Sequence, residues 1–141
     1  FRDLYTIEIH PPLFERAKRR FNGQSHVHPI LGDSATTMPE VLATIPTDAP
    51  TMLWLDGHYS GELTGKGATD CPVIDELERI AARRLERVKI VIDDVRYFGM
   101  DAAYPSLAEL HNVVQRLFPG AVVRIENDMA VIDVLAGPIL R

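Results

Sequence analysis

Residues 53–59 read LWLDGHY, an apolar run that ends in an acid, a glycine and a histidine. Later in the chain, residues 88–94 read VKIVIDD, a second apolar run that ends in two acids. If both runs are parallel strands of one sheet, their carboxyl ends lie side by side at one edge. We therefore expect Asp56, His58, Asp93 and Asp94 to gather in one crevice.

The segments around these two runs predict an alternation of strands and helices. Short runs rich in β-branched and aromatic residues predict strands, and amphipathic stretches between proline, glycine and capping-box signals predict helices. The order β-α-β-α-β-α-β-α-β-β predicts an α/β fold: a doubly wound, mostly parallel, Rossmann-like sheet with helices on both faces and a terminal antiparallel hairpin. The predicted strands cover 4–9, 26–31, 51–55, 88–92, 121–125 and 129–135, and helices are expected after Pro11, Thr37, Pro72 and Ser106.

Length and composition indicate one soluble domain over residues 1–141. Apolar residues make up 46% and charged residues 25%, as in ordinary globular proteins. The net charge of −5 and the lack of a long basic block argue against nucleic acid as a partner. The sequence shows no apolar run long enough to span a membrane, and a single cysteine suits the cytoplasm. Because the chain starts at Phe1 without a methionine, we expect a fragment of a longer domain.

Acidic residues close each strand that should be parallel. Asp56, Asp93 and Asp94 could supply three oxygen ligands to magnesium, calcium or manganese. The alternative is that acids at these positions cap helices or face solvent. His58 could act as a general base, because imidazole titrates near neutral pH, or it could bond to backbone in a loop.

Three further features have a structural and a functional interpretation. Trp54 lies inside a strand, so we expect it in the core. Residues 57–68 lack periodicity, and an irregular stretch of this length suits a functional lid or a disordered loop. Cys71 lies at the start of a predicted helix, where the dipole lowers a thiol pKa, but the sequence shows no histidine partner for a nucleophile. Tyr59, Tyr97 and Phe98 lie in loops beyond strand ends, where they could line a pocket.

The strand-end acids, with WLDGHYSG at 54–61 and VIDDV at 91–95, resemble the class I S-adenosylmethionine-dependent methyltransferases. The pairing of LDGH with IDDV is similar to the metal-dependent O-methyltransferases within that class. The resemblance covers nearly the whole chain, and it implies methyl transfer to a hydroxyl group of a small-molecule acceptor.

The resemblance also implies roles for individual residues. Glu8 would bind the ribose hydroxyls of the methyl donor, and Asp33 with Ser34 would face its adenine. Asp56 would line the donor site and act in catalysis. His58 would take the acceptor proton. Magnesium or another divalent cation would lower the pKa of the acceptor hydroxyl, held by the three carboxylates already named.

The chain departs from the family at its start. The family's first strand and its glycine-rich loop would precede Phe1, which leaves unpaired strand edges between the strands that end at Glu8 and Asp56. Two alternatives therefore stay open: a noncatalytic or truncated Rossmann-like binding domain, and a magnesium-dependent hydrolase or phosphotransfer domain. The identity of the acceptor and the formation of a homo-oligomer are both left open by the sequence.

Overall fold

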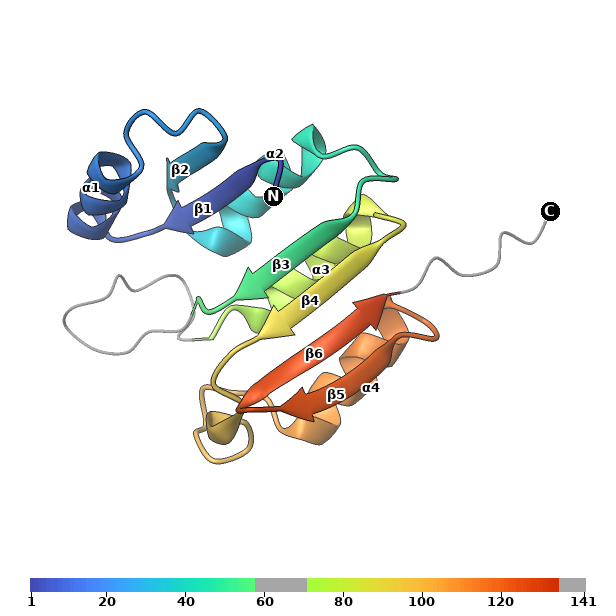
Figure 1. The fold of residues 1–141 in the computed structure, drawn as a ribbon. Helices are drawn as coiled ribbons and strands as arrows, with labels where there is room; N and C mark the ends of the chain where they lie inside the picture. The colour runs from blue at the N-terminus through green and yellow to red at the C-terminus, as the bar shows by residue number, and fades with distance from the viewer. Residues whose placement is uncertain (58–70, 135–141) are drawn as a thin grey trace.

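A computed structural model describes residues 1–57 and 71–134, and its elements follow the predicted alternation (Figure 1). Four α-helices, six strands and a 3-10 turn occur in this part of the chain. In order they are β1 (Leu4–Glu8), α1 (Pro11–Arg20), β2 (Val27–Leu31), α2 (Ser34–Thr44), β3 (Thr51–Leu55), α3 (Val73–Arg83), β4 (Val88–Ile92), η1 (Val95–Tyr97), α4 (Leu107–Leu117), β5 (Val122–Glu126) and β6 (Met129–Val134).

The strands form two sheets rather than the single sheet predicted. β1 pairs in parallel with β2, and a second sheet has the order β3-β4-β6-β5. In that sheet β3 and β4 are parallel, whereas β6 runs antiparallel to both β4 and β5. No backbone ladder joins β1 to β3 in the described residues, so the edges expected to be unpaired lie opposite each other across a gap.

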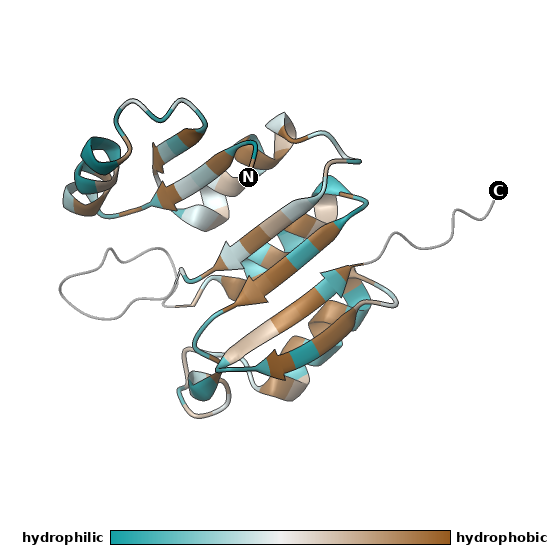
Figure 2. Ribbon diagram, viewed as in Figure 1, coloured by the Kyte–Doolittle hydropathy of each residue, from teal (hydrophilic) through white to brown (hydrophobic). Residues whose placement is uncertain are grey.

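The principal core lies between the four-stranded sheet and its helices. Ile90 and Ile132 on the central strands are fully buried, as are Leu77, Leu110 and Val114 on α3 and α4. Figure 1 shows α2, α3 and α4 on one face of the strands, and Figure 2 shows hydrophobic residues along β4 and β6. By contrast, β1, β2 and α1 contain no residue in the buried class.

The exposure of Trp54 contradicts the prediction that helices cover both faces of the sheet that contains β3. The Trp54 side chain is 53% exposed, and Met52 on the same face of β3 is exposed as well. Because side chains alternate along a strand, Leu53 and Leu55 point toward the helices while Trp54 points away. In this part of the structure the opposite face carries no helix over Trp54, so the prediction that Trp54 belongs to the core was wrong.

The capping-box spacing predicts the start of α4 correctly and the start of α2 wrongly. Ser106 and Glu109 form the predicted capping box at the start of α4. Thr37 and Glu40 have the same spacing but lie inside α2, whose N-cap is Asp33. The Asp33 carboxylate accepts a hydrogen bond from the Ala35 N–H at 2.9 Å, which starts the helix one turn earlier.

The predicted hairpin is formed by β5 and β6. Its two turn residues, Asn127 and Asp128, both have positive φ angles, of 49° and 67°. This is the pattern of a type I′ turn, which matches the twist of the paired strands. Across residues 1–57 and 71–134, no helix combines the length and apolar character needed to cross a bilayer.

Candidate functional site

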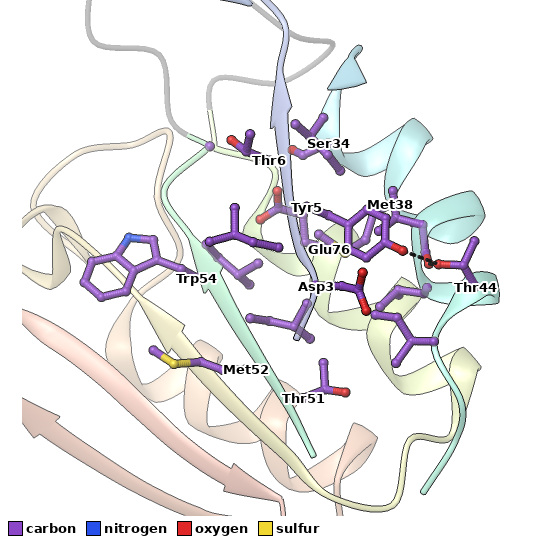
Figure 3. A pocket seen from close by; sticks show the side chains of 18 of the residues that line it. Asp3, Tyr5, Thr6, Ser34, Met38, Thr44, Thr51, Met52, Trp54 and Glu76 are labelled. Atoms are coloured by element: carbon purple, nitrogen blue, oxygen red, sulfur yellow. Dashed lines mark hydrogen bonds between the residues drawn. The ribbon is translucent and has the colours of Figure 1, made fainter. Parts of the chain in front are cut away.

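A cleft of about 950 Å³ lies between the facing edges of β1 and β3 (Figure 3). Its carboxyl end is lined by Glu8 from β1, Asp33 and Ser34 from the β2–α2 junction, and Asp56 after β3. These are the four residues predicted to bind the donor. Parallel strands bring them together because each strand delivers its last residue to the same edge of the fold.

The local structure fixes two of these carboxylates. Glu8 Oε1 accepts a hydrogen bond from the His10 N–H at 2.8 Å, which ties the carboxylate to the turn before α1. Asp33 Oδ1 caps α2, as described above. In both cases the carboxylate can also accept hydrogen bonds through its other oxygen, since an ionised carboxylate has about four lone-pair sites.

Glu76 is a further residue of this cleft that the sequence interpretation overlooked. It lies in the first turn of α3 and is only 2% exposed, although it carries a carboxyl group. Desolvation by this burial raises its pKa, nearby Asp33 and Asp75 raise it further, and the Ser34 hydroxyl opposes the rise. A signal was present, because Glu76 occupies the buried stripe of α3 between Val73 and Ile80.

Gly57 explains how side chains from two helices reach the end of β3. A Cβ atom at this position would lie 3.1 Å from Glu76 Oε1, 3.2 Å from Ser34 Oγ and 3.3 Å from Pro72 Cγ. Such contacts are too tight for a side chain without displacement of these neighbours. The glycine therefore leaves room for polar groups of α2 and α3 at the end of β3.

The three predicted metal ligands divide between two environments. Asp56 and Asp93 both line a small cavity of about 20 Å³, which also touches Glu76 and is large enough for roughly one water-sized occupant. Asp93 Oδ1 accepts a hydrogen bond from the Asp94 N–H at 2.8 Å. Asp56 and Asp93, two of the three predicted ligands, therefore line the same cavity.

Asp94 points elsewhere. Its Oδ1 lies 2.5 Å from Arg96 Nη2, and Arg96 also pairs with Asp128. Asp94 is the N-cap residue of η1, and its backbone has a left-handed φ of 61°. Within the described residues, no three His, Cys, Asp or Glu side chains form a group that could hold a metal ion.

The remaining predicted residues have different outcomes. His58, the predicted base, lies outside the described residues, as does most of the predicted lid. Burial raises the pKa of the Cys71 thiol, and this desolvation is the largest cause, so the expected lowering by a helix dipole was wrong. Cys71 precedes α3 by two residues and is half-buried, which does not favour a reactive thiolate.

Aromatic side chains close the cavity at the carboxyl end of β4. Phe98 is buried and lines the small cavity together with Tyr104, and their rings meet edge to face at 5.5 Å. Tyr97 lies under the Arg96 guanidinium, 4.6 Å from its ring centre, rather than in this cavity. The prediction of a lining role is therefore confirmed for Phe98 but not for Tyr97, while Tyr59 lies outside the described residues. Tyr104, which was not predicted, also lines the cavity.

The four residues predicted to bind the donor line one cleft. Asp56 lines both this cleft and the small cavity that Asp93 also lines. Neither a known protein-family model nor a curated protein sequence matches this chain.

Proposed function

We propose that this domain transfers a methyl group from S-adenosylmethionine to a hydroxyl group of a small molecule, with the help of a divalent cation. The observation that supports this most is the convergence of Glu8, Asp33, Ser34 and Asp56 on one cleft at the carboxyl ends of three strands. Ligands of open α/β sheets bind at this edge.

The side chains of the cleft suit the parts of the donor. The Glu8 carboxylate would accept hydrogen bonds from two ribose hydroxyl groups, and its bond to the His10 N–H would hold it in place. Asp33 and Ser34 would face the adenine, which carries a donor amino group. The acidic residues that line the cleft would also attract a ligand with a positive charge, as the sulfonium donor has.

Catalysis would depend on positioning the acceptor against the donor methyl group. Asp56 and Asp93 would hold the cation, and Asp94 would join them only after leaving Arg96. When bound, such a cation polarises an acceptor hydroxyl and lowers its pKa. His58, which follows Asp56 by two residues, would then remove the hydroxyl proton as general base.

Calorimetry with S-adenosylhomocysteine, the product form of the donor, tests this proposal. We expect 1:1 binding that weakens by about tenfold or more in Glu8→Gln, because hydrogen bonds to a charged group contribute about 1.5–3 kcal/mol. Glu15→Gln, on the exposed surface of α1, is the matched control and should bind normally. Absence of binding by the unaltered protein, with and without magnesium, would contradict the proposal.

A second candidate function is a noncatalytic domain of the same fold that binds a nucleotide-like ligand. The pairing of Asp94 with Arg96 favours it, because this pairing takes one carboxylate away from the predicted metal site. The two candidates differ in turnover. Transfer of a labelled methyl group to a catechol in the presence of magnesium supports the enzyme, whereas donor binding without transfer to any hydroxylated acceptor supports the binding domain.

A further inference from the structure

The cleft between β1 and β3 is bounded by the backbone edges of these two strands. Every residue of both strands lines it, whereas a wall formed by one face of a strand would involve only alternate residues. In Figure 1 the arrows of β1 and β3 point in the same direction. Within the described residues each strand pairs only on its far side, β1 with β2 and β3 with β4.

Hydrogen bonds at the ends of β1 show which of its backbone groups face the cleft. The Leu4 N–H donates toward the β2 side at 2.8 Å, and the Glu8 carbonyl oxygen accepts from the same side at 3.0 Å. The N–H and C=O groups of successive residues in a strand point to opposite edges. Those of Tyr5 and Ile7 therefore point into the cleft.

The edge of β3 has the same arrangement. The Thr51 N–H donates toward the β4 side at 2.9 Å, and the Leu55 carbonyl oxygen accepts from that side at 3.0 Å. The backbone groups of Met52 and Trp54 therefore point into the cleft from the side opposite β1. In residues 1–57 and 71–134, no backbone hydrogen bond crosses the cleft between the two edges. Two parallel rows of backbone donors and acceptors thus face each other.

Helix α2 gives the cleft an apolar floor and connects the two sheets. Three buried residues of α2 line the cleft: Met38, Val41 and Leu42. The Thr44 hydroxyl at the end of α2 donates to the Tyr5 hydroxyl on β1 at 3.4 Å, as Figure 3 shows. On the other side, Arg83 Nε of α3 donates to the Leu42 carbonyl oxygen at 2.8 Å.

We propose that this cleft is the docking site for one extended, apolar segment of a partner polypeptide, which lies parallel to β1 and β3 and pairs with both edges. Such a segment satisfies both rows of backbone groups and joins the two sheets into one. Its central residues exclude proline, because a strand paired on both sides uses the N–H groups at both of its edges. The inference rests on the backbone edges and is independent of the proposed function.

The surroundings of the cleft determine the chemistry of the partner segment. Residues that point toward α2 meet its apolar floor. Residues on the opposite face lie beside Met52 and Trp54, which are 44% and 53% exposed and would gain cross-strand neighbours. Both faces therefore favour apolar and β-branched side chains, as in a central strand of a parallel sheet.

Calorimetry of the full chain with two synthetic peptides tests the proposal. One is KKGVIVVTGKK, acetylated and amidated, and its control is KKGVIPVTGKK, which has the same charge and the same attraction to an acidic cleft. We expect 1:1 binding of the first and about tenfold or more weaker binding of the second, because proline removes an N–H group. Equal affinity for both peptides, or no binding of the first, would overturn the inference.

A pair of protein variants tests the edge of β3. Met52→Pro removes an N–H that faces the cleft and leaves the groups that bond to β4 in place, as proline on an edge strand does. We expect it to weaken binding of KKGVIVVTGKK by about tenfold, whereas Met52→Thr, which keeps the N–H, should change the affinity by less than about threefold. Undiminished binding by a folded Met52→Pro contradicts edge pairing. If this variant does not fold, the two peptides decide the matter.

NMR spectroscopy tests the geometry of the complex. On binding of KKGVIVVTGKK, protection from hydrogen exchange should increase more for the four amides that face the cleft than for those of Thr6 and Leu53, which face β2 and β4. A spin label at the amino end of the peptide should broaden signals near the starts of β1 and β3. Broadening near the ends of these strands would show an antiparallel segment and contradict the proposal.

Sedimentation without peptide tests a second copy of this chain as the occupant. We expect the unaltered protein and Met52→Pro to have the same oligomeric state. A dimer that Met52→Pro converts to a monomer would show that a second copy occupies the cleft, and the proposed partner segment would then be wrong.

Discussion

Glu76 makes the stability of the fold depend on pH. Burial raises the pKa of this carboxyl group above the ordinary value of 4.5, so the folded protein holds the proton more tightly than the unfolded chain. Its favourable contribution is therefore complete below about pH 4.5 and is lost as the pH rises through the folded-state pKa. We expect Glu76→Gln to raise the melting temperature at pH 8 and to have less benefit at pH 4.

The matched control for this prediction is Glu78→Gln, which changes an exposed carboxylate on the same helix. Thermal unfolding followed by circular dichroism across pH 4–8 provides the measurement. A gain in stability for Glu76→Gln that is equally large at pH 4 and pH 8 would show that burial of the charge is not its source.

Arg96 pairs with Asp94, one of the three carboxylates predicted to hold a cation. Its guanidinium pairs with Asp94 and Asp128, and releasing Asp94 would let a third carboxylate turn toward Asp93. We expect Arg96→Ala to increase the affinity for magnesium, because the substitution removes the guanidinium that pairs with the Asp94 carboxylate. Calorimetric titration with magnesium measures the change. Arg116→Ala, which removes an exposed arginine of α4 that pairs with Glu78, should leave the affinity unchanged.

The acidic residues show which features of the candidate site could be predicted from the sequence and which could not. Acids at strand ends could be predicted as a group, because the alternation of elements places strand ends together. The partner of each acid could not be predicted. Arg96 lies only two residues after Asp94, yet the sequence does not indicate that the two side chains pair, because the pairing depends on the backbone turn at Asp94, where φ is 61°. Glu76 was overlooked because a carboxyl group is rarely buried, although helix periodicity places it in the buried stripe of α3.

At the scale of elements, the capping box at α4 predicts a local contribution to stability. The Ser106 hydroxyl accepts from the Glu109 N–H, and the Glu109 carboxylate accepts from the Ser106 N–H at 2.8 Å. We expect Ser106→Ala to lower the free energy of unfolding by about 0.5–2 kcal/mol, the usual effect of losing an N-cap. Ser25→Ala, in an exposed turn, is the control. Chemical denaturation that shows equal stability for both variants would contradict this assignment.

A capping signal identifies the start of a helix only when no better N-cap residue lies nearby in the sequence. Thr37 and Glu40 have the spacing of a capping box, yet Asp33 four residues before Thr37 is a better cap and begins α2 earlier. At α4, Ser106 is the N-cap that the capping-box spacing predicts. In the same way, the turn at Asn127 and Asp128 could be predicted from sequence, because both residue types tolerate positive φ angles.

At the scale of the molecule, the two sheets should differ in stability. The β1–β2 sheet and α1 contribute no residue to the buried class, whereas the other sheet contains fully buried residues on β4 and β6. Regions with few buried apolar contacts open at lower free energies. We therefore expect amides of β1 and β2 to exchange hydrogen faster than those of β4 and β6. Mass spectrometry after exchange provides the measurement, and equal protection in both sheets would contradict the prediction.

The division into two sheets shows what pattern alone could predict about the whole fold. Element type and order followed from periodicity and turn residues, and parallel pairing within β1–β2 and β3–β4 followed from the crossovers between them. The exposure of Trp54 did not follow, because an apolar strand reads the same whether one or both of its faces are covered.

Backbone NMR with S-adenosylhomocysteine tests whether the carboxyl end of the cleft binds the methyl donor. We expect saturable shifts of the amide signals around Glu8, Asp33, Ser34 and Asp56, with those of the β5–β6 turn unchanged. Saturable shifts confined to other parts of the chain, or no shift at millimolar ligand, would contradict it.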